Sequence, residues 1–191
     1  ILCDDSVDET TQKIENYLKG NCSHLQVKED KGEGWKLTWG EVRPGVTLKH
    51  LHRTSRSGFK GGALNLALTL SDPRCEFISI FDADFVPYPD TLYMFLKYFK
   101  VQNNLSEDYT QSRVAAVQGY QWHVLNKSEN WITRGVRSEY AGSYVVERAG
   151  EEIYSGLKQI SGAVYMIRRK PLEKVGWGTF SLSHLGGRGL G

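Results

Sequence analysis

The chain has 191 residues, a net charge of +2 and a hydrophobic content of 40%, which allows a soluble globular protein with a core of its own. Because the net charge is small, the sequence does not indicate a nucleic-acid-binding surface, and no nucleic-acid partner is expected. No run of 18 or more apolar residues occurs, so no segment of the chain is predicted to span a membrane. Three cysteines without C-x-x-C spacing favour reduced thiols.

Apolar spacing and turn residues divide the chain into alternating strands and helices. A short strand is expected at the N-terminus, and further strands within 26–45 (with a hairpin-like insertion) and at 46–53, 77–81, 113–122 and 159–169. Helices are expected at about 10–18, 63–70, 90–100, 128–150 and 171–175. This alternation predicts an α/β fold with a mixed, mostly parallel sheet flanked by helices.

The two ends of the chain differ from its middle. It begins without methionine, inside an apolar run, which predicts a fragment whose first strand and any membrane helices lie outside residues 1–191. We expect residues 1–177 to form one domain. Residues 178–191 are glycine-rich and lose the periodic pattern, so they are expected to be disordered or not native to the domain.

Two carboxylates follow the apolar run at 77–81. Asp82 and Asp84 are separated only by Ala83 and precede the segment "FVPYPD". Like charges this close repel, so they either point apart into water or share a positive partner. Mg²⁺ and Mn²⁺ take a few carboxylate oxygens and complete their coordination with phosphate and water. The pair is therefore a candidate metal–diphosphate site, and two solvated loop carboxylates are the alternative.

A basic, glycine-rich loop and a pair of aspartates are further candidates. The segment "RTSRSGFKGGALN" at 53–65 combines Arg56 and Lys60 with several glycines. Cations and closely approaching backbone amides suit phosphate, whereas the alternative is a solvated basic turn. Asp4 and Asp5 follow the first strand and can accept hydrogen bonds from a nucleoside, although these residues taken alone favour capping of the following helix.

Several other classes of site are disfavoured by spacing. The five histidines form no H-E-x-x-H or H-x-x-x-H pair, so a zinc site is not expected. No G-x-S-x-G segment is present, which disfavours a serine hydrolase. The aromatic side chains of Trp122, Trp131, Tyr140 and Tyr144 are expected mostly in the core, although aromatic faces also suit sugar rings.

Taken in order, the segments "CDDS", "RSGFKGGALN", "FDADFVPYPD", "VQGYQ" and "ISGAVYMIRRKPLEKVGW" resemble the family 2 glycosyltransferases of GT-A fold. The resemblance covers residues 1 to about 177 and is closest to the cellulose synthase and mannan synthase-like branch. It implies a GT-A domain that transfers a sugar from a UDP- or GDP-sugar to a glycan or polysaccharide. It also implies Mg²⁺ or Mn²⁺ as cofactor, and a full-length protein on the cytosolic face of a membrane.

The resemblance also implies roles for individual residues. Those implied to contact the nucleotide or diphosphate are Asp4, Asp5, Arg56, Lys60, Asp82 and Asp84, of which Asp84, with Asp82, holds the metal. Those implied to lie beside the acceptor and donor sugar are Gln118, Gln121, Ser161 and Gly162.

One expected motif is missing. An inverting transferase needs a base that deprotonates the acceptor hydroxyl, and in this family it is the aspartate of a T-E-D motif soon after "VGW". Here the sequence reads "GTFSLSHLGGRGLG", without an acidic residue after Glu173, so no catalytic base is assigned. Little sugar transfer is therefore expected, and a non-catalytic nucleotide-sugar-binding module is the alternative. A nucleotidyltransferase is disfavoured, because its basic loop would directly follow the first strand.

Overall fold

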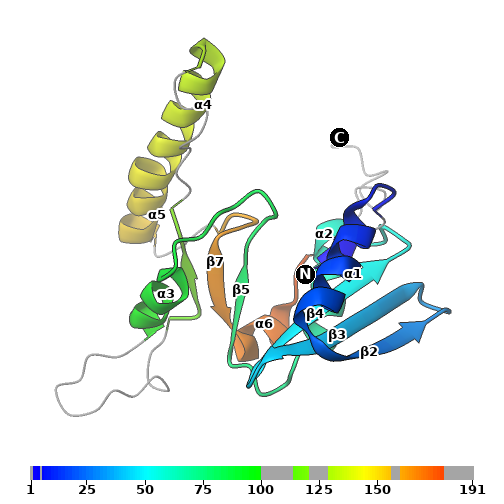
Figure 1. Cartoon of the computed structure of the whole chain (residues 1–191). Helices are drawn as coiled ribbons and strands as arrows, with labels where there is room; N and C mark the ends of the chain where they lie inside the picture. Colours follow the sequence, from blue (N-terminus) through cyan, green and yellow to red (C-terminus); the bar gives the residue numbers. More distant parts are fainter. Residues whose placement is uncertain (1, 5, 100–113, 121–128, 156–159, 179–191) are drawn as a thin grey trace, which may run out of the picture. The chain divides into compact units, whose positions relative to one another are not determined.

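The computed structural model of the chain describes residues 2–4, 6–99, 114–120, 129–155 and 160–178, and Figure 1 shows its helices and strands. The chain divides into two compact units, Ile1–Pro73 with Val175–Gly191 and Arg74–Lys174. Each unit has a sheet and a hydrophobic cluster of its own. The expectation that residues 1–177 form one domain stays a prediction.

The first unit contains a four-stranded sheet and two helices. Its elements are β1 (Leu2–Asp4), α1 (Thr10–Asn21), β2 (Ser23–Asp30), β3 (Trp35–Arg43), β4 (Val46–Arg53) and α2 (Phe59–Thr69). The strand order is β1-β4-β3-β2, with β1 parallel to β4 and the remaining pairs antiparallel. The strand expected at 46–53 has those bounds, and the hairpin expected within 26–45 is formed by β2 and β3.

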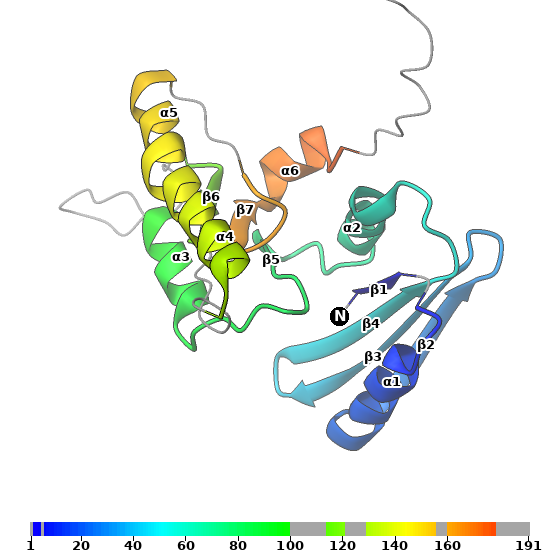
Figure 2. The ribbon, with the colours of Figure 1, turned by 90° about the horizontal axis from the view of Figure 1, so that it is seen from above.

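Successive side chains of β3 and β4 point to opposite faces of this sheet, and a helix covers each face. Figure 2 shows α1 and α2 on opposite sides of the sheet. Trp35, Leu37 and Leu51 are buried against apolar residues of α2. On the other face, Lys36 donates to Glu15 of α1 at 3.0 Å. Leu18 of α1 is fully buried, so this amphipathic helix has its apolar side inward.

The second unit contains a three-stranded sheet and a long helical segment. Its elements are β5 (Phe77–Ile80), α3 (Thr91–Phe99), β6 (Ala116–Gln118), α4 (Trp131–Gly142), a π-helical turn (Ser143–Glu147), α5 (Arg148–Ser155), β7 (Tyr165–Arg168) and α6 (Arg169–Val175). In Figure 1, α4, the π-helical turn and α5 follow one another as a single rod. The single helix expected at 128–150 is thus interrupted by a π-helical turn.

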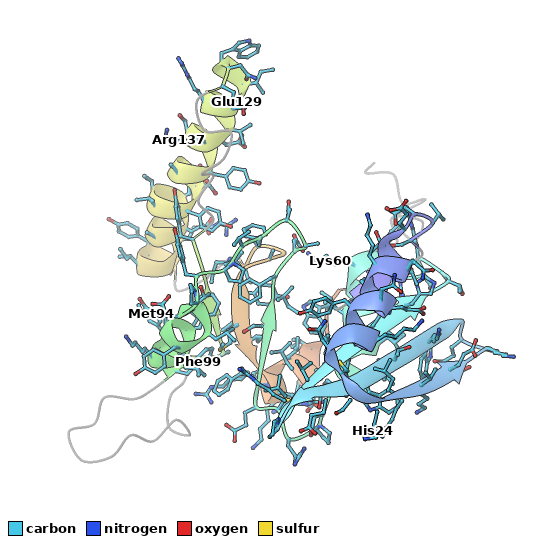
Figure 3. The ribbon with its side chains drawn as sticks, viewed as in Figure 1. His24, Lys60, Met94, Phe99, Glu129 and Arg137 are labelled. Carbon is cyan, nitrogen blue, oxygen red and sulfur yellow. The ribbon has the colours of Figure 1, made fainter. Side chains whose placement is uncertain are left out.

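Aromatic packing of α3 forms the core of the second unit. Phe99, labelled in Figure 3, is fully buried, and its ring centroid lies 4.8 Å from that of Phe77 in β5. Phe95 and Met166 belong to the same buried cluster. Helical spacing of Leu92, Phe95, Leu96 and Phe99 predicts one apolar face, of which Phe95 and Phe99 are buried and Leu96 is partly buried, whereas Leu92 is exposed.

The expectation of a mixed α/β chain is confirmed, but the mostly parallel sheet is wrong for the described residues. Among the described strand pairs only β1–β4 is parallel. The physical reason lies in the connections, because β2, β3 and β4 are joined by turns at Gly34 and Gly45, which both have positive φ. A tight turn can join only antiparallel strands. In the second unit, β7 lies between β5 and β6 and runs opposite to both.

Within the described residues, no helix combines the length and the apolar character needed to cross a bilayer. The residues expected to form the glycine-rich tail lie outside the described part of the chain, except for Gly178.

Candidate functional site

The two carboxylates of the D-x-D pair lie in a turn directly after β5. The backbone N–H of Phe85 donates to the carbonyl oxygen of Asp82 at 3.1 Å, which closes this turn. Phe81 and Phe85 pack against the core cluster of the second unit, so apolar residues on either side anchor the acidic segment. Asp82 is half-buried and Asp84 is exposed.

The segment at 161–164 is held beside this turn by backbone hydrogen bonds. The N–H of Val164 donates to the carbonyl oxygen of Ile80 at 2.8 Å, and the N–H of Gly119 donates to the carbonyl oxygen of Val164 at 2.7 Å. A side chain at Gly119 would meet Val164 at 2.7 Å and the ring of Phe95 at 3.0 Å. Only glycine therefore fits at this crossing of β6 and the 161–164 segment.

Gln118 fixes the same segment through its side-chain amide. Its Nε2 donates to the carbonyl oxygens of Ala163 and Val164, both at 2.9 Å, and its Oε1 accepts from the backbone N–H of Ser161 at 2.9 Å. The amide is thus engaged on both its donor and acceptor sides. This gives Gln118 a positioning role, and the acceptor-channel role implied by the resemblance stays a prediction.

These two segments and the helical rod border an open pocket of about 470 Å³, a volume within the range of small-molecule sites. Asp82, Asp84 and Phe85 line it from the turn after β5. The segment at 161–163 lines it from the side held by Gln118. The rod contributes Glu139, Tyr140, Ser143, Tyr144 and Arg148.

Tyr144 connects the rod to the 161–163 segment. Its hydroxyl lies 2.9 Å from Oγ of Ser161, and its ring stacks with that of Tyr140 at a centroid distance of 6.2 Å. The ring of Tyr120 meets it edge-on at 5.4 Å. Tyr144 belongs to the π-helical turn, a feature that often occurs at functional sites. Both Tyr140 and Tyr144 therefore border a pocket instead of a closed core.

The carboxylate oxygens of Asp82 and Asp84 are of the type that binds a hard divalent cation. Two carboxylates from one turn supply oxygen ligands, and Mg²⁺ or Mn²⁺ bound in this way retains positions for water and phosphate. The described residues contain no group of three or more His, Cys, Asp or Glu side chains able to enclose an ion.

The basic loop lies in the first unit, between the end of β4 and the start of α2. Arg53 is buried and donates to the carbonyl oxygen of Ser57 at 3.1 Å. Gly58 has a φ of 69°, and a side chain at Gly62 would lie 2.4 Å from the carbonyl oxygen of Ser57. Two glycines of this loop are thus required by backbone geometry, and their contact with a ligand stays a prediction.

Other implied site residues lie around this loop or outside the described residues. Arg56 and Lys60 are exposed, and Lys60 is labelled in Figure 3. Asp4, the last residue of β1, is in register with Arg53 at the end of β4, so the parallel pair brings the first acidic position to the start of the basic loop. Asp5 and Gln121 fall outside the described residues.

Asn65, at the end of K-G-G-A-L-N, makes reciprocal hydrogen bonds with Trp177. Its Nδ2 donates to the Trp177 carbonyl oxygen and its Oδ1 accepts from the Trp177 N–H, each at 2.9 Å. The motif thus has a structural function that connects positions 112 residues apart.

Sequence reasoning did not select Glu139 and Arg148. For Arg148, the available signal was its spacing from the tyrosines, because Tyr140, Tyr144 and Arg148 follow one another at intervals of four residues. Side chains at this spacing lie along one face of a helix, and here that face borders the pocket.

No protein-family model matches the chain, and no solved structure matches it. Among curated proteins, it is similar to the probable glucomannan 4-beta-mannosyltransferase 7 of Oryza sativa subsp. japonica, with 29% identity over 170 residues. The match covers 88% of this chain and 25% of the rice protein, so the chain spans about a quarter of that relative. The name of the rice protein is that of a mannosyltransferase, and the similarity supports the resemblance to family 2 glycosyltransferases of the cellulose synthase and mannan synthase-like branch.

Proposed function

We propose that this chain is the donor-binding part of a glycosyltransferase that transfers a sugar from a nucleotide-diphosphate sugar to a polysaccharide. The proposal includes a GT-A type of domain, a Mg²⁺ or Mn²⁺ ion at Asp82 and Asp84, and a full-length protein at the cytosolic face of a membrane. The observation that supports it most directly is the pocket of the second unit, which brings Asp82 and Asp84 together with Ser161 and Gly162.

Each side of the pocket has a distinct part in this proposal. The carboxylates of Asp82 and Asp84 hold the ion, which when bound neutralises charge on the diphosphate. The 161–163 segment, kept in place by Gln118, offers a hydroxyl and exposed backbone beside the sugar. The stacked rings of Tyr140 and Tyr144 present aromatic surface that suits the C–H face of a sugar ring.

For the first unit, considered by itself, we propose the contacts that the resemblance implies. Asp4 and Asp5 are proposed to bind the nucleoside, and Arg56 and Lys60 the phosphates. The parallel pairing of β1 with β4 supports this assignment, because it places Asp4 beside the strand that leads into the basic loop. Ligands of α/β proteins commonly bind beyond the carboxyl ends of parallel strands.

A module that binds a nucleotide sugar without transferring it is the second candidate. The observation that favours it is the segment after Trp177, which carries no T-E-D sequence and no acidic residue. Both candidates require the same donor site. They differ in whether a base acts on an acceptor hydroxyl, so measured sugar transfer to an acceptor separates them.

Metal-dependent nucleotide binding tests the donor site. Thermal unfolding is measured with UDP and with GDP, each with and without Mn²⁺. At a ligand concentration about 100 times the dissociation constant, binding adds about 2.7 kcal/mol to the free energy of unfolding. We expect an increment with at least one nucleotide when Mn²⁺ is present, and its loss in Asp84→Asn.

The matched control is Glu76→Gln, which removes an exposed carboxylate just before β5 and should preserve the increment. A wild-type chain that shows no Mn²⁺-dependent increment with either nucleotide would contradict the proposed donor site. An increment that survives Asp84→Asn would place the ion elsewhere.

A further inference from the structure

Arg148 carries two polar groups in the second unit that lack partners. The Nε and Nη1 atoms of its guanidinium are buried and have no hydrogen-bond partner within the described part of the chain. A guanidinium remains charged at all relevant pH values, and a buried unpaired donor costs about 1–3 kcal/mol, with more for charged groups. A position with this cost indicates that a ligand completes the hydrogen bonds.

The Arg148 side chain is fixed in place by Tyr144. The guanidinium carbon lies 4.2 Å from the centroid of the Tyr144 ring, a cation–π arrangement that orients the guanidinium plane. Tyr144 is itself held by its contacts with Ser161 and Tyr140. The cation is thus positioned before any ligand arrives, which lowers the cost of binding.

Arg148 lines the same pocket as Asp82 and Asp84. If those carboxylates hold a divalent ion and the ion holds a diphosphate, the group as a whole has excess negative charge. A cation from the protein reduces that excess, and a planar guanidinium donates well to phosphate oxygens. From these observations we propose that Arg148 binds the diphosphate of the donor in this pocket. The proposal rests on the function proposed above.

The position of Arg148 explains why the sequence motifs do not include it. It is the first residue of α5, directly after the π-helical turn. Tyr144 and Arg148 are four residues apart, a spacing that places side chains on the same face of a helix.

The test uses inorganic pyrophosphate, which contains the diphosphate without nucleoside or sugar. Its dissociation constant is measured by calorimetry, with Mg²⁺ present, for the wild-type chain and for Arg148→Gln. Because Arg148→Gln removes charge-assisted hydrogen bonds, its affinity for pyrophosphate should fall about 10-fold to 100-fold. Arg148→Lys keeps the charge but loses the planar geometry, so its affinity should lie between the two.

The control variant is Arg137→Gln. Arg137 is an exposed arginine of α4 on the same rod, labelled in Figure 3, and it does not line the pocket. Its loss should leave pyrophosphate affinity within about twofold of wild type. An equal loss in Arg137→Gln and Arg148→Gln would show a general charge effect and would overturn the proposal.

A measurement on the wild-type chain covers the case in which Arg148→Gln fails to fold. The Nε–H resonance of Arg148, identified by its absence in the spectrum of Arg148→Lys, should shift as pyrophosphate is added. An unchanged resonance at saturating pyrophosphate would overturn the proposal. A parallel titration with glucuronate tests a sugar carboxylate, and a response to glucuronate alone would overturn the assignment to a diphosphate.

The outcomes separate this proposal from the function on which it rests. If the wild-type chain binds UDP or GDP with Mn²⁺ and Arg148→Gln binds them equally well, only the role of Arg148 is wrong. If the wild-type chain binds neither nucleotide, the donor site itself is wrong. A loss of affinity confined to Arg148→Gln supports both.

Discussion

The two units differ in the hydrogen-bond and ion-pair partners of their cationic side chains. In the first, Lys36 pairs with Glu15 at 3.0 Å, and buried Arg53 donates to backbone carbonyl oxygens of the loop that follows it. In the second, Arg148 keeps two buried donors without partners among the described residues, beside a pocket. The first unit therefore completes these interactions internally, whereas the second leaves one incomplete where a ligand can bind.

The unpartnered groups in the described part of the first unit are of another kind. They are Nε2 of His50 and Nδ1 of His52. An imidazole can be neutral, and a neutral unpaired group costs less to bury than a charged one. The comparison thus indicates that an unpaired imidazole is tolerable in a packed layer, whereas an unpaired guanidinium points to a ligand.

The largest expected effect tests the core that supports the pocket. Phe99→Ala removes a fully buried ring that contacts Phe77 and should lower the free energy of unfolding by about 3–5 kcal/mol. Hydrogen exchange in β5 and β7 should accelerate accordingly. Tyr98→Ala, on the exposed side of the same helix, should change stability by less than about 0.5 kcal/mol. Similar losses in both variants would contradict the assigned packing of α3.

A smaller effect tests which bonds hold the 161–163 segment that lines the pocket. Gln118→Met keeps the length of the side chain but removes its bonds to Ser161 and Ala163. Unsatisfied backbone groups should lower the free energy of unfolding by about 1–3 kcal/mol, as measured by denaturant titration. The control is Gln12→Met, since Gln12 is exposed and its side chain bonds Asn16 at 3.4 Å on the helix surface. Equal free energies of unfolding in the two variants would show that backbone hydrogen bonds alone hold the 161–163 segment.

The smallest expected effect concerns pH and the first unit. Burial, reinforced by the nearby His52, lowers the pKa of His50 below its ordinary value. The unfolded chain therefore takes up a proton near pH 6.5 while the folded chain does not. Stability should be fully present above about pH 6.5 and should fall as the pH drops toward the folded-state pKa.

His50→Gln should reduce this pH dependence in thermal unfolding curves between about pH 7 and pH 5. His24→Asn is the control, because His24 is exposed, and it should preserve the dependence. A stability that increases as the pH falls through this window, and does so only in the presence of His50, would contradict the direction of the pKa shift.

Much of the local structure followed from sequence patterns. The strand at 46–53 agreed with prediction, and so did most of the buried side of α3 except Leu92, because alternation and helical spacing depend on neighbouring residues. The D-x-D pair was found for the same reason, since both carboxylates belong to one short segment. The direction of the strands was predicted less well, because short turns at Gly34 and Gly45 impose antiparallel pairing.

The sequence by itself determined the resemblance to family 2 glycosyltransferases, the acidic pair and the basic loop, because each depends on residues close together in the chain. Only the tertiary structure decided that Asp84, Ser161 and Arg148 line one pocket. That arrangement depends on bonds such as the one from Gln118 to Ala163, 45 residues away. Contacts between distant segments leave no periodic signal, so they become visible only when the chain has folded.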